Sequence, residues 1–414
     1  MACGSVELFL LLPAETMSSD LALDTALQHT GLAPFDPHTD AAPVAVPIMR
    51  TSTVRFRNLD ALDRAQVDKA DPEKRSVTYG RSGMDTHAAL EQVFCQLESA
   101  TQALLAPSGM AAITLGLLAL LDSGDHVLIA DSAYGPVRYL EKTVLRRMGI
   151  QATFCAPTPE EMERHLQDNT RMVYVESPGS LLMQMLDMPA LAEFGRKHNL
   201  LLVTDNTWGS GYIYRPLELG FDVSIVAGTK YVAGHSDLML GAVMSADPAI
   251  NKRLHDNHYA LGFSISADDA WLALRGVRTL PIRMRESAAN ALKVCQFLDS
   301  RPEVTRIYHP AWPQDPGHVL WQRDCTGSNG MLSVQLRMSN AQARVFVDAL
   351  TLFGIGFSWG GFESLVQLVD TAFLSGHSYW QGSQDCLVRL HIGLESSHDL
   401  CTDLTQAFEK AAQV

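Results

Sequence analysis

The sequence predicts an α/β protein with a large domain built on a mainly parallel sheet, followed by a smaller C-terminal α/β domain. Short apolar runs alternate with helix-period stretches from about residue 103 to residue 245, a pattern typical of βαβ units. From about Gly330 the pattern changes, because residues 331–336 and 387–395 alternate apolar and polar side chains as half-buried strands do. These two observations together predict a two-domain α/β chain.

Composition excludes several classes of function. The chain has 414 residues, of which 47% are hydrophobic and 19% charged, as in a soluble globular protein of two or three domains. A net charge of −14 argues against general binding to nucleic acid or to anionic membranes. No apolar run approaches the roughly 18 residues of a membrane helix. The seven cysteines include no C-x-x-C pair, so we expect reduced thiols in a cytoplasm and no metal site.

The N-terminal part is expected to contribute little to either domain. Residues 1–16 contain F-L-L-L without a basic segment before it, and we interpret them as a non-native extension or disordered tail. Residues 17–71 are polar and rich in proline, which predicts an extended arm with one strand at 51–56. An arm that cannot bury itself favours contact with a neighbouring subunit.

The segment Y-G-R-S-G, from Tyr79 to Gly83, precedes a helix-period stretch at 86–98. The planar fork of Arg81 would suit a phosphate, because a guanidinium can bind two phosphate oxygens at once. Taken alone, the segment favours a surface turn over a phosphate site.

A second candidate for anion binding begins the large domain. Residues 103–113 predict a strand, a turn and a helix, with Ser108, Gly109 and Met110 at the helix start, where backbone N–H groups can bind an anion. The strand expected within 125–134 would bring Tyr134 to the same edge of the sheet, although a core tyrosine is the alternative.

Two further strands lead to side chains that can take part in catalysis. Residues 201–208 form an apolar run that reaches Asp205, and residues 223–226 precede Lys230. Ligands bind outside the carboxyl ends of parallel strands, so these two side chains should meet at one edge. A lysine amine with a desolvated stem has a lowered pKa and can attack an aldehyde. The alternative for a lone lysine is an ordinary side chain that reaches to water.

The C-terminal domain adds a glycine-hinged loop at 357–365, with Ser358 and Trp359 at its front, and a strand that places Arg389 among apolar neighbours. A buried arginine is costly unless it is paired. Its partner would be either an acidic side chain or the α-carboxylate of an amino-acid substrate.

The motif T-K-Y-x-x-G-H-S-D around Lys230, with Asp205, resembles the Cys/Met-metabolism family of pyridoxal-phosphate enzymes from about Thr51 to about Phe408. The resemblance implies an aspartate-aminotransferase-like (fold type I) structure, with a pyridoxal 5'-phosphate-binding domain at 72–290 and a small domain with its connecting helix at 291–414. It implies that Lys230 holds the cofactor aldehyde and that Asp205 pairs with the ring nitrogen. It assigns the remaining cofactor contacts to Tyr134, Ser108, Gly109, Met110 and Thr229, and to Tyr79 and Arg81 of a neighbouring subunit.

Two departures from the common family pattern indicate a branch. After Pro178, where most relatives carry an asparagine, the sequence E-S-P-G-S has Gly179, and Ala227 stands where many relatives carry a serine. Both resemble the bacterial β-lyase branch rather than the γ-lyases and γ-synthases.

The resemblance then implies a carbon–sulfur lyase of methionine biosynthesis that cleaves cystathionine to homocysteine, pyruvate and ammonia, and that also acts on cystine or cysteine. Arg389 and the Ser358 region would fix the substrate carboxylate, and Lys230 would remove the Cα proton. Tyr79 and Tyr134 would assist, while Trp359 and Tyr259 would contact the distal end of the substrate. We expect a homotetramer of dimers with shared sites. The alternatives are a γ-lyase or γ-synthase and, more remotely, a regulatory protein without activity.

Overall fold

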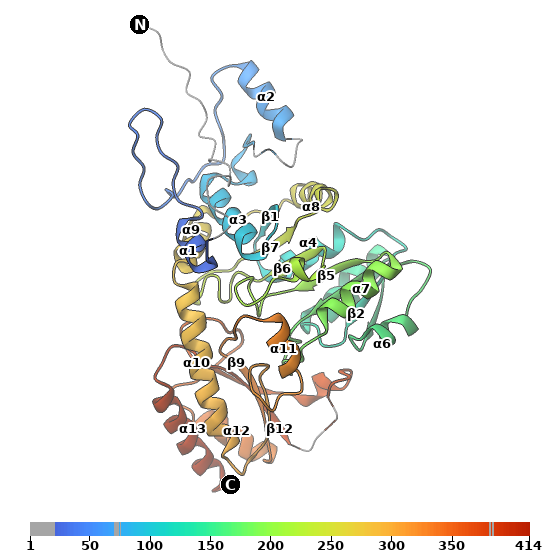
Figure 1. Ribbon diagram of the computed structural model, residues 1–414, viewed down its shortest axis with the longest axis vertical. Coiled ribbons are helices and arrows are strands. Elements are labelled where there is room, and N and C mark those ends of the chain that lie inside the picture. The colour runs from blue at the N-terminus through green and yellow to red at the C-terminus, as the bar shows by residue number, and fades with distance from the viewer. Residues whose placement is uncertain (1–20, 70–73, 75, 381, 383–384) are drawn as a thin grey trace.

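The computed structural model describes residues 21–69, 74, 76–380, 382 and 385–414. The molecule is elongated, with the N-terminal arm at one end, a seven-stranded sheet in the middle and a five-stranded sheet at the other end (Figure 1). The predicted tail at 1–16 lies outside the described residues, as does the expected border between arm and large domain at residue 71. Within the part of the chain that is described, no helix has both the length and the apolar character needed to span a bilayer.

The seven-stranded sheet has the order β1-β7-β6-β5-β4-β2-β3. Its strands are β1 (Gln102–Ala106), β2 (His126–Ala130), β3 (Gln151–Cys155), β4 (Thr170–Glu176), β5 (Leu201–Asp205), β6 (Val223–Val226) and β7 (Gly241–Ser245). Only β7 runs antiparallel to its neighbours β1 and β6, while the remaining pairs are parallel. The predicted mainly parallel sheet is therefore confirmed.

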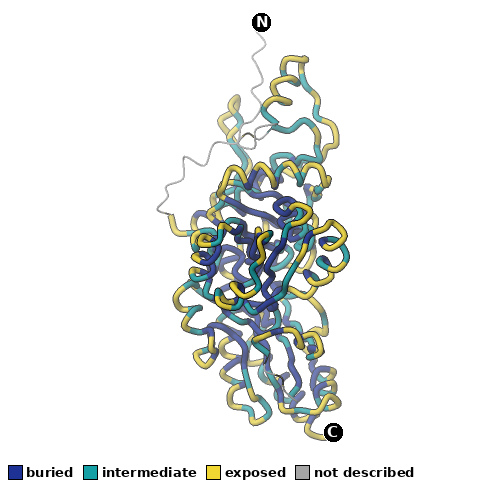
Figure 2. The backbone as a smooth tube through the Cα atoms, turned by 90° about the vertical axis from the view of Figure 1, so that its right-hand side faces the viewer, coloured by how far each residue is buried: buried dark blue, intermediate teal, exposed yellow. Residues whose placement is uncertain are grey.

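Helices cover both faces of this sheet, which explains why its strands are nearly continuous apolar runs. Within β2, Val127 and Ile129 pack into one apolar cluster and Leu128 into the other. The covering helices are α3 (Asp85–Glu98), α4 (Gly109–Leu118), α5 (Pro136–Leu140), α6 (Pro159–Arg164), α7 (Met188–His198) and α8 (Pro248–Leu261). Figure 2 shows the resulting buried interior in dark blue.

The second sheet has the order β10-β11-β12-β9-β8. Its strands are β8 (Val304–Tyr308), β9 (Met331–Leu336), β10 (Gly354–Ile355), β11 (Leu365–Val369) and β12 (Cys386–His391). Helix α9 (Ala267–Val277) packs against α3 in the large domain (Figure 1). The helices of the second half are α10 (Leu280–Asp299), α11 (His318–Asp324), α12 (Asn340–Ala349) and α13 (Ser397–Ala411). In β12, Val388 and Leu390 pack into the core of the small domain, whereas Leu387 joins the core of the large domain. This sheet therefore turns one face toward the large domain.

The connection between the two halves is α10, which runs along one side of the molecule (Figure 1). It is continuous across the border expected at residues 290/291. The stretch at 271–285, with its several arginines, lies in α9, α10 and the turn between them.

The arm is less extended than its proline content suggested. It contains α1 (Leu23–His29) and α2 (Leu59–Lys69), so the prediction of extended chain is wrong there. The strand expected at 51–56 is also wrong, since Thr53 forms only a single bridge, with Tyr79. Helix α2 has no buried residue, and much of the arm is exposed (Figure 2). Good helix formers in its sequence, rather than packing, explain that helix.

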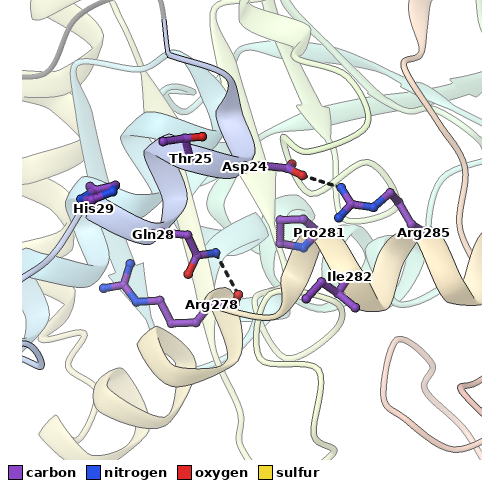
Figure 3. A pocket seen from close by; sticks show the side chains of 8 residues that line it. All are labelled: Asp24, Thr25, Gln28, His29, Arg278, Pro281, Ile282 and Arg285. Atoms are coloured by element: carbon purple, nitrogen blue, oxygen red, sulfur yellow. Dashed lines mark hydrogen bonds and ion pairs between the residues drawn. The ribbon is translucent and has the colours of Figure 1, made fainter.

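Helix α1 attaches the start of the arm to the body of the molecule, and a second attachment follows at residues 46–50, where Val46 is buried and the Met49 amide donates to Thr86 Oγ1 at 2.9 Å. Asp24 pairs with Arg285 of α10 at 2.5 Å, and the Gln28 side chain donates to the Arg278 carbonyl at 3.0 Å (Figure 3). These residues line an open pocket of about 280 Å³ between α1 and α10.

Candidate active site

Lys230 lies in the turn that follows β6, at the edge of the sheet where the parallel strands end. Its Nζ donates a hydrogen bond to Ser358 Oγ at 2.6 Å and lies 5.2 Å from the centroid of the Trp359 ring. Burial lowers the pKa of Lys230 to about 8; Arg389 lowers it further, while Asp205 opposes the shift. The amine is thus easier to deprotonate than an exposed lysine, as a nucleophile toward an aldehyde requires.

Asp205 is the last residue of β5 and is buried. It accepts a hydrogen bond from the Thr207 amide at 2.9 Å. Burial raises the pKa of Asp205, against the hydrogen bonds from Thr207 and the attraction of Lys230. Among the described residues no cationic side chain lies within ion-pair distance of this carboxylate, so it can accept a protonated ring nitrogen.

The N-terminus of α4 offers N–H donors beside the Lys230 turn. Ser108 caps the helix by accepting from the Ala111 amide at 3.1 Å. The amides of Gly109 and Met110 have no acceptor within the described part of the chain. A Cβ at position 109 would lie only 2.6 Å from Ala227 Cβ, so the helix start and the Lys230 turn touch and leave no room for a larger residue. These free amides suit a phosphate.

Thr229 is engaged differently. Its hydroxyl donates to the Leu240 carbonyl at 3.1 Å and accepts from the Leu240 amide at 2.8 Å. The single hydroxyl proton is therefore already used, which leaves the α4 amides as the donors of this region. A phosphate contact from Thr229 stays a prediction.

Tyr134 lies in the loop after β2 and is held by a residue that the sequence analysis missed. Its amide donates to Glu176 Oε2 at 2.6 Å. Glu176 ends β4 and stands beside Asp205 in the register of the two strands. Burial raises the pKa of Glu176 well above its usual value, and the Asp205 charge raises it further. Glu176 could have been found by the rule that found Asp205, because both are carboxylates at the end of a buried strand.

Arg389 lies on β12 and points toward the same site. Its Nη2 donates to the Ser358 carbonyl at 3.1 Å. Burial lowers its pKa to about 10, opposed by the nearby Tyr134. No carboxylate of the described residues lies within ion-pair distance of Arg389, so the structural partner considered for it is not found there. The guanidinium is left for an anion from solution.

The 357–365 loop, whose Ser358 contacts both Lys230 and Arg389, is held in place by His391 and Tyr231. The Gly360 amide donates to His391 Nε2 at 3.1 Å, and the Tyr231 ring packs against both Trp359 and His391, at 5.5 and 5.8 Å between centroids. Ser358 has φ +80°, a conformation that few non-glycine residues adopt. Such a strained position is kept only where surrounding contacts over-determine it, as at functional sites.

Arg81 and Tyr259 form a separate cluster near the arm, and Tyr79 lies two residues before Arg81 in the sequence. Arg81 donates to the Tyr259 carbonyl at 2.8 Å and lies 4.3 Å above its ring, where Lys69 also packs at 4.0 Å. Tyr79 is half exposed. Among the described residues, their contacts do not reach Lys230, so one chain does not unite the two clusters.

The geometry around Lys230 meets the three needs of pyridoxal phosphate, namely an amine for the aldehyde, an acid for the ring nitrogen and N–H donors for the phosphate. Such a site defines a pyridoxal-phosphate-dependent enzyme. The chain belongs to the Cys/Met metabolism family of these enzymes, whose model matches residues 24–409. The predicted family, cofactor and fold type I class are confirmed.

Relatives cover nearly the whole chain. A cystathionine beta-lyase of Bordetella avium is 63% identical over 94% of this chain and 98% of its own. The cystathionine beta-lyase MetC of Escherichia coli is 36% identical over 95% of this chain and 99% of its own. A solved cystathionine gamma synthase from Xanthomonas oryzae, in complex with cystathionine, is 30% identical, covers 95% of this chain and 99% of its own, and has a TM-score of 0.85.

Proposed function

We propose that the protein is a carbon–sulfur β-lyase that cleaves L-cystathionine to homocysteine, pyruvate and ammonia. One observation carries the proposal: Lys230 Nζ and Arg389 Nη2 bind the hydroxyl and the carbonyl of the same residue, Ser358. In an amino acid the carboxylate is bonded to Cα. A guanidinium that holds the carboxylate therefore brings the Cα proton to the neighbouring amine.

Within this proposal Lys230, Asp205, Tyr134 and the amides of Gly109 and Met110 hold the cofactor. Pyridoxal phosphate, when bound, supplies an aldehyde for the substrate amine and a ring that withdraws electrons from Cα. Asp205 would keep the ring nitrogen protonated, because its charge favours the cationic form. Glu176 holds the Tyr134 loop in place through its amide.

The chain's own residues then position the substrate and move its proton. Arg389 binds the α-carboxylate through paired charged hydrogen bonds. Lys230 Nζ accepts the Cα proton. Ser358 Oγ orients this nitrogen by accepting a hydrogen bond from it. Loss of the thiolate from Cβ and addition of water complete a β-elimination that balances as cystathionine plus water giving homocysteine, pyruvate and ammonia.

Elimination at Cβ is favoured over elimination at Cγ by the 63% identical relative, which is named for the β-lyase reaction, and by Gly179 and Ala227. Cystine and cysteine fit the same chemistry as further substrates. A γ-lyase or γ-synthase is the second candidate, because the solved γ-synthase shares the fold. A non-catalytic role is disfavoured by the presence of Lys230, Asp205 and Arg389.

The separation of the Arg81 cluster from Lys230 supports the shared site that the family resemblance implies. In that assembly the Tyr79 and Arg81 side chains of one subunit approach the phosphate in the other, and Tyr259 approaches the distal end of the substrate. The proposed enzyme is a tetramer in the cytoplasm. Light scattering of the purified protein would measure its mass, and a monomeric mass with full activity would contradict the shared site.

Identification of the keto acid formed from cystathionine tests the reaction. Pyruvate together with homocysteine is the expected result. Formation of 2-oxobutyrate with cysteine would instead establish γ-elimination. No keto acid from protein that carries its cofactor would leave the site standing and the proposed substrate wrong.

A further inference from the structure

A carboxylate outside the site, Asp131, joins the large domain to the segment between β11 and β12. Asp131 follows β2 directly and is 7% exposed. Its Oδ2 accepts a hydrogen bond from the Ser378 amide at 2.9 Å, across 247 positions of the sequence. The loop that follows β2 and the segment that precedes β12 are thus linked by a partly buried hydrogen bond.

Several buried polar atoms at and around Asp131 lack a hydrogen-bond partner among the described residues. Asp131 Oδ1 and both ring nitrogens of His377 are buried without a hydrogen-bond partner among the described residues. Buried polar atoms are paired in most proteins, and a group left unpaired calls for a reason. Asp131 raises the pKa of His377, although burial lowers it more strongly, and Arg138 is the other charge beside the imidazole. The unpaired groups on both sides of this contact stabilise the fold poorly, which favours a role beyond stability.

The 371–380 segment is anchored to the large domain at a few points, although Phe373 within it is exposed. Leu374 is buried in the large-domain core, and Tyr379 and Trp380 pack against it. The segment leaves β11 and leads toward β12, where Arg389 lies directly opposite Gln367. A shift of the segment can therefore reach β12 through β11, the strand that the segment follows and that pairs with β12.

The loop that follows β2 approaches the small domain at a second point, Tyr134. Tyr134, three residues after Asp131, is close enough to Arg389 for each to shift the pKa of the other. Asp131 thus fixes the small domain beside the point where Tyr134 and Arg389 face one another.

We propose that Asp131 is a positioning residue: by holding Ser378 it sets the distance of Arg389 from Tyr134 and Lys230, and thereby the affinity for the substrate carboxylate. This inference rests on the proposed role of Arg389 as the carboxylate clamp. It does not depend on whether elimination occurs at Cβ or at Cγ.

The test compares variants of the holoenzyme. Asp131→Ala and Ser378→Pro delete the contact from its two sides, while Asp131→Asn keeps an oxygen for the Ser378 amide. Both deletions should raise KM for cystathionine by about tenfold, the usual scale for one lost hydrogen bond to a charged group, with kcat within about threefold. Asp131→Asn should restore KM to within about threefold of the unmodified enzyme.

The matched control is Asp187→Ala. Asp187 binds Arg323 at 2.9 Å and so also joins the large domain to α11, but away from β12. The KM of the Asp187→Ala enzyme for cystathionine should be unchanged. Glycine binding, followed through the cofactor absorbance without turnover, should weaken in parallel with KM in the Asp131 and Ser378 variants.

An Arg389→Ala background makes the test specific. If Asp131 acts through Arg389, adding Asp131→Ala there should raise the glycine dissociation constant no further. An unchanged KM and glycine affinity in both deletion variants, or a full additional effect without Arg389, would overturn the inference. Failure of the unmodified enzyme to release pyruvate would be a failure of the proposed function instead, and the glycine measurement would still decide the role of Asp131.

Discussion

Replacement of Ser358 by alanine should affect the proposed base, Lys230, without affecting the proposed carboxylate-binding residue, Arg389. The variant loses the 2.6 Å hydrogen bond from Lys230 Nζ but keeps the backbone carbonyl to which Arg389 donates. A hydrogen bond to a charged group contributes about 1.5–3 kcal/mol. Only the part that orients Nζ in the transition state affects the rate, so the lower end of that range applies, which corresponds to about a tenfold loss of kcat. KM should change by less than about twofold.

Steady-state pyruvate formation from cystathionine measures both constants. Ser236→Ala is the matched control, because Ser236 also has a positive φ and binds Glu363 of the same loop at 2.5 Å without contacting Lys230. The control should keep kcat. A Ser358→Ala enzyme with unchanged kcat, or with KM raised in place of a lowered kcat, would refute the assigned role of the hydroxyl.

Three further outcomes follow from the site. Arg389→Lys should raise KM by at least about tenfold with intact cofactor absorbance, because lysine cannot bind a carboxylate through two parallel hydrogen bonds; equal KM values would contradict the clamp. The rate of cofactor attachment to the cofactor-free protein should rise with pH through about 8, where half of the Lys230 amines are neutral, and level off at higher pH, while a continued rise toward 10.5 would contradict its lowered pKa. Gly109→Ala should weaken cofactor binding by about tenfold or more in a fluorescence titration, since the added carbon would meet Ala227 at 2.6 Å. Gly327→Ala, which meets nothing within 4 Å, is its control, and equal affinities would count against the α4 cradle.

The sheet of the large domain could be predicted because its strands are buried on both faces. Val223–Val226 and Leu201–Asp205 are short apolar runs bounded by polar residues, and both strands have the ends expected for them. The arm was predicted less well. Its prolines suggested extended chain, whereas α1 packs where α9 leads into α10 through contacts 250 and 261 positions apart in the sequence, which no local pattern reveals.

The site was predictable where a polar residue interrupts or ends an apolar strand, as for Lys230, Asp205 and Arg389. What the sequence does not reveal is how these residues are joined. The Lys230–Ser358 hydrogen bond spans 128 positions and depends on how the two domains pack. Tyr259 shows the converse, because it lies with Arg81 and not with Trp359, and only the folded chain separates the two groups.

In the proposed enzyme, Lys230 carries the cofactor in a site that also binds the amino-acid substrate. Borohydride reduction of the holoenzyme would fix the cofactor to its lysine, and peptide mapping by mass would locate the added group. We expect the modification on the peptide that contains Lys230, and its prevention when cystathionine is present during reduction. Modification of another lysine, or the same extent of labelling with substrate present, would contradict it.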